Sequence, residues 1–258
     1  MNSVILARYN ESLDWIDQIP DDFEVIIYNK GEPIEAPDVL RRATRIIDRP
    51  NVGRESETYI HHMMQVEDDS DFTVYAQGDP HAHSPDFIAL LENWRDWNKV
   101  QALSWQWLAD KNVPPEKLLA DYQRELGGRL RVRPERFSLT AWGPIDFQDA
   151  GAHGMGMVYR ICQGGLPDGT NIASHFLRLC KLDALAEKAD RNTLGIFSYG
   201  AIFAARNDLV AAVPRESLDL LSQFSTAGIA AYGYILERMW LHLLGADFIL
   251  PKNQPSRI

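Results

Sequence analysis

The sequence predicts an α/β fold, a single domain over residues 1–258 whose mostly parallel central sheet is flanked by helices, as in Rossmann-like proteins. Short apolar runs with strand composition occur at 3–7, 23–28 and 72–76, and each is followed by polar residues. A helical signal separates the first two runs, so a right-handed βαβ unit is the natural assembly. The length also suffices to bury one large core.

Composition excludes several classes of protein. Hydrophobic residues make up 45% of the chain and charged residues 24%, which is ordinary for a globular protein. The net charge of −10 argues against broad binding to nucleic acid or anionic membranes. No apolar run approaches the roughly 18 residues of a membrane span. Because Cys162 and Cys180 form no CxxC pair and no signal peptide is visible, we expect a cytoplasmic protein whose oligomeric state stays open.

Polar and charged residues follow the first two predicted strands. After the strand at 3–7, Asn10 or Ser12 is expected to begin a helix that Pro20 ends. Arg8 and Lys30 come directly after the two strands, and neighbouring parallel strands would place both cations at one edge of the sheet. That edge would suit a diphosphate. The alternative is that each is a solvated loop charge.

The next helical run begins close to a third cation. Asn51 or Gly53 is expected at its start, where free N–H groups favour an anion. Arg54 would add positive charge at the same place. The first third of the chain therefore predicts an anion site formed by strand ends and a helix start.

The stretch from Phe72 to His83 carries the strongest chemical signal. A buried strand there is followed by a loop with Asp79, His81 and His83. In open α/β sheets ligands lie beyond the carboxyl ends of the strands. This cluster could hold a divalent cation, with Mn or Mg as the candidate cofactor. The alternative is a polar turn whose histidines face water.

The remainder of the chain predicts further helices and one interrupted strand. The expected elements are a strand at 44–47, a strand at 195–204 broken by Gly200, long loops or a mobile flap at 138–171, and helices at 84–91, 110–136, 172–189, 214–224 and 232–244. The Gly-x-x-Gly-x-Gly of 151–156 lacks the spacing and the preceding strand of a dinucleotide fingerprint. A glycine within a strand permits the close approach of a ligand or another backbone.

Glu237 and Arg238 fall off the apolar face of the last predicted helix. They are either an exposed ion pair or, for Glu237, a carboxylate that points toward the site. The sequence lacks the motifs of several common enzyme classes. It contains no GxxxxGK[ST] phosphate loop, no HExxH zinc-binding motif, no GxSxG nucleophile elbow and no set of protein-kinase motifs. Nucleotide hydrolysis by a P-loop and serine-hydrolase chemistry are therefore not expected.

Six segments together resemble a family. They are similar, in order, to blocks of the DUF3431 proteins, a family of unknown function found in fungi and bacteria: LARYNESLDWI, IIYNKG, NVGRESETYIHH, FTVYAQGDPHAH, YGAIFAARNDL and YILERMW. They leave residues from about 95 to 190 poorly matched. The wider arrangement resembles GT-A glycosyltransferases, with a nucleotide-binding βαβ unit, a mid-chain acidic metal motif, a Gly-Ala strand and a late acidic helix.

This resemblance implies a nucleotide-binding half at 1–95 and an acceptor-side half with long loops at 96–258. It implies that the nucleotide is surrounded by Arg8, Asn10, Glu11, Asn29 and Lys30. It also implies that Asp79 with His81 takes the place of an Asp-x-Asp metal motif, and that Glu237 is the catalytic or acceptor-binding acid. The sequence departs from the pattern at His81, which replaces the second acid, and at Ala82, where relatives often carry an acid.

We therefore predict an enzyme that transfers a sugar from a nucleotide-sugar donor to an acceptor that the sequence does not identify. A divalent ion or fixed cations, including Lys30 or Arg54, would stabilise the leaving diphosphate, and Glu237 would be the base. One alternative is a metal-dependent hydrolase that uses Asp79, His81 and His83. Another is a non-catalytic binding protein that keeps a pocket at the sheet.

Overall fold

A six-stranded sheet with the order β3-β2-β1-β4-β8-β5 forms the centre of the computed structural model, which describes residues 1–104, 132 and 134–250. The strands are β1 (Asn2–Arg8), β2 (Phe23–Asn29), β3 (Arg45–Asp48), β4 (Phe72–Gln77), β5 (Val100–Ala102) and β8 (Phe203–Arg206). The first four run parallel, whereas β8 pairs antiparallel with both β4 and β5. The predicted α/β fold with a mostly parallel sheet flanked by helices is confirmed.

The central strands are parallel and buried because they are apolar on both faces. Leu6 in β1 lies opposite Ile27 in β2 and Ala76 in β4, and all three side chains are buried. Near-continuous apolar runs are typical of parallel strands that are covered on both sides. The same register places Arg8 opposite Asn29, so the polar residues after β1 and β2 reach one edge of the sheet together.

The crossover between β1 and β2 differs from the prediction. It contains the short 3-10 helix η1 (Ile16–Gln18) instead of an α-helix that starts near Ser12. Pro20 ends the segment too soon for further turns, and the Trp15 indole donates a hydrogen bond to the Gly78 carbonyl (3.0 Å), which holds the loop against the end of β4. The helix that follows β3 is present as α2 (Arg54–Met63).

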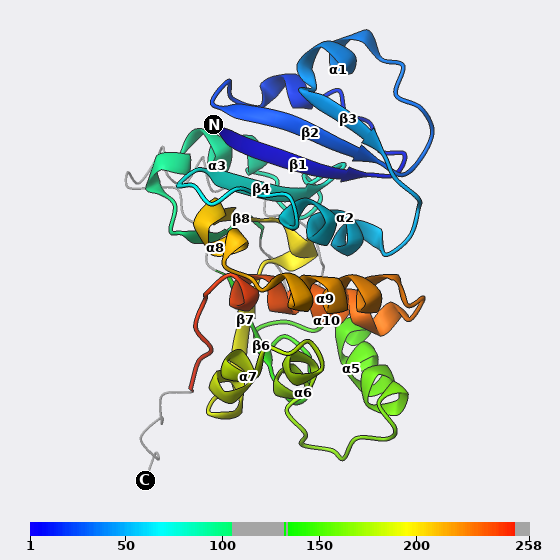
Figure 1. Cartoon of the computed structure of the whole chain (residues 1–258), viewed down its shortest axis with the longest axis vertical. Helices are drawn as coiled ribbons and strands as arrows, with labels where there is room; N and C mark the ends of the chain where they lie inside the picture. The colour runs from blue at the N-terminus through cyan, green and yellow to red at the C-terminus, as the bar shows by residue number, and fades with distance from the viewer. Residues whose placement is uncertain (105–131, 133, 251–258) are drawn as a thin grey trace.

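Helices cover the sheet and connect it to a second, smaller sheet. The remaining helices are α1 (Pro37–Arg42), α3 (Phe87–Glu92), η2 (Trp94–Asp96), α5 (Ala150–Cys162), α6 (Ile172–Leu179), α7 (Asp183–Asp190), η3 (Tyr199–Ala201), α8 (Asn207–Ala211), α9 (Arg215–Thr226) and α10 (Ala230–Leu243). The small sheet pairs β6 (Glu135–Ser138) with β7 (Leu194–Phe197) in antiparallel fashion. Figure 1 shows α9 and α10 between the large sheet and the layer formed by β6, β7, α5, α6 and α7.

Several predictions for the second half were wrong. The 138–171 segment contains α5, because Asp149 caps its first turn by accepting a hydrogen bond from the Ala152 N–H (2.9 Å). The single helix predicted at 172–189 is divided into α6 and α7, and Lys181 between them has a φ of 57°.

The strand predicted at 195–204 is also divided. Its start is β7 in the small sheet and its end is β8 in the large one, with η3 between them. Most of the helix predicted at 110–136 lies outside the described residues, and its last two positions belong to β6. No helix among the described residues is long and apolar enough to cross a bilayer.

Candidate functional site

Two adjoining cavities lie at the carboxyl edge of β1, β2 and β4. The first, of about 280 Å³, is lined by residues from the ends of β1 and β2 and from the start of α2. The second, of about 190 Å³, is lined by residues from η3, α5 and α10 and by His83. Arg54, Glu55 and Gln77 border both cavities. We call them the first and second compartments of one cleft.

Arg8 and Asn29 tie the strand ends of the first compartment together. The Arg8 guanidinium donates to Asn29 Oδ1 (2.6 Å) and to the carbonyls of Glu11 (3.0 Å) and Glu32 (2.9 Å). Asn29 in turn donates to Asp48 Oδ1 at the end of β3 (3.1 Å). Both residues lie at this edge of the sheet, and much of their hydrogen-bonding capacity is used to fix it.

Asn10 and Glu11 shape the loop that follows β1. Asn10 Oδ1 accepts a hydrogen bond from the Glu32 N–H (3.0 Å), which joins this loop to the one after β2. Glu11 Oε2 accepts from the Tyr9 N–H (2.7 Å). Glu11 lines the first compartment, whereas Asn10 lies behind it in the contact between the two loops.

Lys30 holds the start of α2 in place through its ammonium group. Its Nζ donates to the carbonyls of Val52 (2.8 Å) and Arg54 (2.5 Å) and forms an ion pair with Glu57 (2.8 Å), with both side chains almost fully buried. Burial lowers the pKa of Lys30. Burial alone would raise the pKa of Glu57, but the hydrogen bonds from Lys30 and Arg49 lower that pKa below its ordinary value. The Lys30 ammonium group is thus engaged within the protein by two carbonyls and one carboxylate.

Arg54 is an exposed cation at the junction of the two compartments. Gly53 and Arg54 have φ values of 64° and 51°, and this turn brings the chain into α2 without a side-chain cap. The Arg54 side chain is exposed beside Gly233 of α10. Among the described residues its guanidinium has no hydrogen-bond or ion-pair partner. Arg54 therefore keeps its donors for a ligand.

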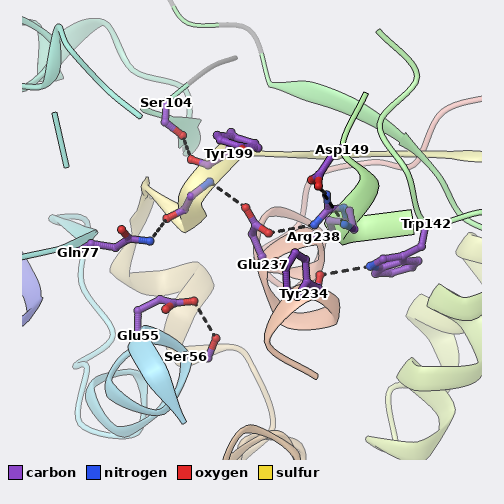
Figure 2. A network of polar contacts seen from close by, with 12 residues as sticks. Glu55, Ser56, Gln77, Ser104, Trp142, Asp149, Tyr199, Tyr234, Glu237 and Arg238 are labelled. Carbon is purple, nitrogen blue, oxygen red and sulfur yellow. Dashed lines mark hydrogen bonds and ion pairs between the residues drawn. The ribbon is translucent and has the colours of Figure 1, made fainter. Parts of the chain in front are cut away.

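Glu237 is held in the second compartment by two fixed donors. Its Oε1 accepts from the Gly200 N–H (2.8 Å) and its Oε2 from Arg238 (2.9 Å). Arg238 also donates to Asp149 Oδ2 (3.0 Å), and its guanidinium lies 4.5 Å from the centre of the Phe197 ring. Figure 2 shows this network. The interpretation as an exposed ion pair is wrong, because the Arg238 side chain is 0% exposed.

Gly200 joins β4 to α10. Its N–H donates to Glu237, and its carbonyl accepts from Gln77 Nε2 (3.0 Å) at the end of β4 (Figure 2). Its φ is 68°, and a Cβ at this position would lie 2.5 Å from His83 Cδ2. A glycine does permit a close approach here, but the approaching group is an imidazole ring.

The three predicted metal ligands are divided between two places. Asp79 Oδ1 accepts from the His81 N–H (3.1 Å) and lies 2.9 Å from His81 Nδ1, at an exposed position where the His81 ring meets Trp15. His83 instead lines the second compartment, where its ring meets Tyr199 edge-on and burial lowers its pKa. In the described part of the chain, no group of three or more His, Cys, Asp or Glu side chains is arranged to hold a metal ion.

The structure also adds residues that the sequence did not single out. Glu55, in the first turn of α2, borders both compartments; burial and the charge of Glu237 raise the pKa of its carboxyl group. Asp149 and Gln77 enter the site through the Arg238 and Gly200 contacts. The helix start at Asp149 could have been found from its capping pattern, whereas Glu55 carries no local signal.

Comparison with known proteins gives no assignment. No family model, no curated protein and no solved structure matches the chain. The resemblance to DUF3431 proteins and to GT-A glycosyltransferases therefore stays a prediction. The function has to be inferred from the chemistry of the cleft.

Proposed function

We propose that this protein is a glycosyltransferase-like enzyme that transfers a sugar from a nucleotide-sugar donor to an acceptor. One observation carries the proposal: a single cleft joins a compartment with a free cation, Arg54, to a compartment with a firmly held carboxylate, Glu237. Sugar transfer needs both groups, because negative charge grows on the leaving diphosphate while a proton leaves the acceptor.

The first compartment suits the diphosphate. It lies beyond the carboxyl ends of parallel strands, where ligands bind in open α/β sheets. The start of α2 has no side-chain cap, so the N–H groups of its first turn favour an anion together with the Arg54 guanidinium. In this proposal Arg8, Asn29 and Lys30 hold the compartment in shape, and Asn10 and Glu11 shape the loop beside the nucleoside.

The second compartment suits an acceptor hydroxyl. Each Glu237 oxygen accepts one hydrogen bond from the protein and keeps a further lone pair. The fixed donors hold the carboxylate in one orientation, which favours its action as a general base on a bound hydroxyl. Gln77 and Tyr234 supply polar groups at the walls that suit other hydroxyls of a sugar-like acceptor.

A divalent cation stays a prediction for the loop after β4. Asp79 and His81 are the pair that would hold it, and a bound ion would neutralise charge on the diphosphate. His83 faces the second compartment and does not complete a ligand set with them. The roles of Arg54 and Glu237 described above do not depend on the metal.

The test is thermal unfolding with UDP, GDP and CMP sugars, each with and without manganese. A ligand at about 100 times its dissociation constant stabilises by about 2.7 kcal/mol, which raises the midpoint by about 5 to 10 °C for a chain of this size. Arg54→Met should abolish this shift and leave the midpoint of the free protein unchanged, because the Arg54 side chain is exposed. The matched control is Arg191→Met, which removes an exposed arginine that does not line the cleft.

The outcomes separate the candidate functions. A shift that requires manganese and is lost in Asp79→Ala would place the cation in the loop after β4. Failure of every nucleotide sugar to bind would refute sugar transfer. Manganese binding alone, with cleavage of phosphate esters, would favour the metal-dependent hydrolase. No shift with any probe would favour a non-catalytic binding protein.

A further inference from the structure

Glu55 is half-buried and occupies a central place in the cleft. It projects from the first turn of α2 and borders both compartments, so a ligand that spans the cleft passes its carboxyl group. The Ser56 hydroxyl donates a long hydrogen bond to Glu55 Oε1 (3.5 Å). Figure 2 shows Glu55 on α2 and Glu237 on α10 at the same site.

The two glutamates differ in the hydrogen-bond donors that contact their carboxyl groups. Glu237 accepts a hydrogen bond from the Gly200 backbone N–H and another from the buried Arg238 guanidinium. Among the residues that the structure describes, no such pair of donors contacts Glu55. The ammonium group nearest to it along the cleft, Lys30, is already bound to Glu57 and two carbonyls.

The charged and titratable groups around Glu55 come from three directions. Glu237 faces it from α10, Lys30 lies after β2, and Arg54 and Tyr59 belong to its own helix. Burial is the main influence and raises the pKa of Glu55, and Glu237 raises it further. The Glu55 backbone N–H, Arg54 and Lys30 act in the opposite direction without reversing the shift. One cavity thus holds a carboxyl group with a raised pKa, Glu55, and a second carboxyl group that two donors hold in place, Glu237, an arrangement that suits an acid and a base.

We infer that Glu55 is the second catalytic carboxyl group of the cleft and is the acid that protonates the leaving phosphate, while Glu237 is the base for the acceptor. This inference rests on the proposed sugar transfer. The acceptor oxygen bonds to the anomeric carbon and its proton passes to Glu237. The bond from that carbon to the phosphate oxygen breaks, and the oxygen keeps the electron pair and takes the proton of Glu55. Proton movement from Glu237 to Glu55 through water restores the starting state.

The first test needs no substrate. Carbon-13 NMR titration of the glutamate carboxyl groups would be run on the whole protein and on Glu55→Gln and Glu237→Gln. The signal that is missing in Glu55→Gln should titrate above the ordinary glutamate range, and it should titrate at lower pH in Glu237→Gln. Titration of this signal in the ordinary range would overturn the inference, whatever the protein binds.

The second test uses the nucleotide sugar that gives the largest unfolding shift. Glu55→Gln should lower kcat by about 100-fold and change KM by less than about twofold, while the control Glu187→Gln, an exposed residue of α7, should match wild type. A 2-chloro-4-nitrophenyl glycoside of the same sugar should restore the Glu55→Gln rate, because that leaving group departs without a proton. It should not restore Glu237→Gln.

These results distinguish a failure of the inference from a failure of the function. Equal slowing of Glu55→Gln with both donors would overturn the acid role even if sugar transfer is confirmed. A protein that binds no nucleotide sugar would overturn the catalytic role along with sugar transfer. The NMR titration would still decide separately whether Glu55 carries a proton.

Discussion

Replacement of Arg238 by methionine should destabilise this protein more than any surface charge change. The Arg238 side chain is 0% exposed and forms ion pairs with Glu237 and Asp149, which are 15% and 17% exposed. Methionine matches the length of the arginine stem, so the main loss is the positive charge. Two nearly buried carboxylates would then lie without a cation between them.

The expected loss is about 3 to 5 kcal/mol of unfolding free energy, the usual cost of removing one partner from a buried ion pair. Loss of the contact between the guanidinium and Phe197 adds up to about 1 kcal/mol. For a chain of this size, each kcal/mol lowers the unfolding midpoint by about 2 to 4 °C. Arg238→Met should therefore unfold roughly 6 to 24 °C below wild type.

Urea unfolding followed by circular dichroism and tryptophan fluorescence would measure the effect. The matched control is Arg191→Met, because Arg191 is 76% exposed and pairs with Glu187 at 3.5 Å on the surface of α7. Such exposed pairs contribute less than about 1 kcal/mol. Adding Glu237→Gln and Asp149→Asn to Arg238→Met should recover more than half of the loss, since no uncompensated charge remains.

The reasoning would be refuted if Arg238→Met stayed within about 1 kcal/mol of wild type, as the control should. It would also fail if neutralising the two carboxylates gave no recovery. The loss would then come from packing and not from the unpaired charges.

Two further predictions concern stability. Gly200→Ala should cost more than Gly228→Ala, because both glycines have positive φ but only at Gly200 would the new Cβ meet a neighbour, His83 at 2.5 Å; equal costs in urea unfolding would argue against this close contact. Burial lowers the pKa of His242 to about 4, and its Nε2 accepts from the Ile196 N–H, so the unfolded chain binds more protons between pH 6.5 and 4. The contribution of His242 to the unfolding free energy should fall by roughly 3 kcal/mol as pH decreases across this range, so His242→Gln should reduce the slope of unfolding free energy against pH; an unchanged slope would contradict the assignment.

Local patterns predicted the elements of the large sheet well. The runs at 3–7, 23–28 and 72–76 correspond to β1, β2 and β4, because each is mostly apolar and is followed by polar residues. The same patterns failed around Gly200. There, two strands of different sheets follow one another with only η3 between them, and composition cannot reveal which partner each strand pairs with.

The candidate site was only partly visible for the same reason. Glu237 was singled out because the resemblance to GT-A glycosyltransferases implies an acid on a late helix. Its partners were not found, since Gly200 and Arg238 become a pair of donors only after η3 and α10 pack together. The contact from Arg238 to Asp149 spans 89 positions and that from Gln77 to Gly200 spans 123, distances over which sequence pattern carries no information.

By itself the sequence determined the α/β class, the positions of the central strands and the gathering of polar residues at one edge of the sheet. These follow from hydrophobic runs and their ends, which are local properties of the chain. Only the tertiary structure decided which charges are available. Lys30 and Arg8 are engaged by carbonyl and side-chain acceptors from neighbouring loops, whereas the Arg54 guanidinium has no partner among the described residues. A cation is free or engaged according to the acceptors that packing brings to it, and those come from distant parts of the chain.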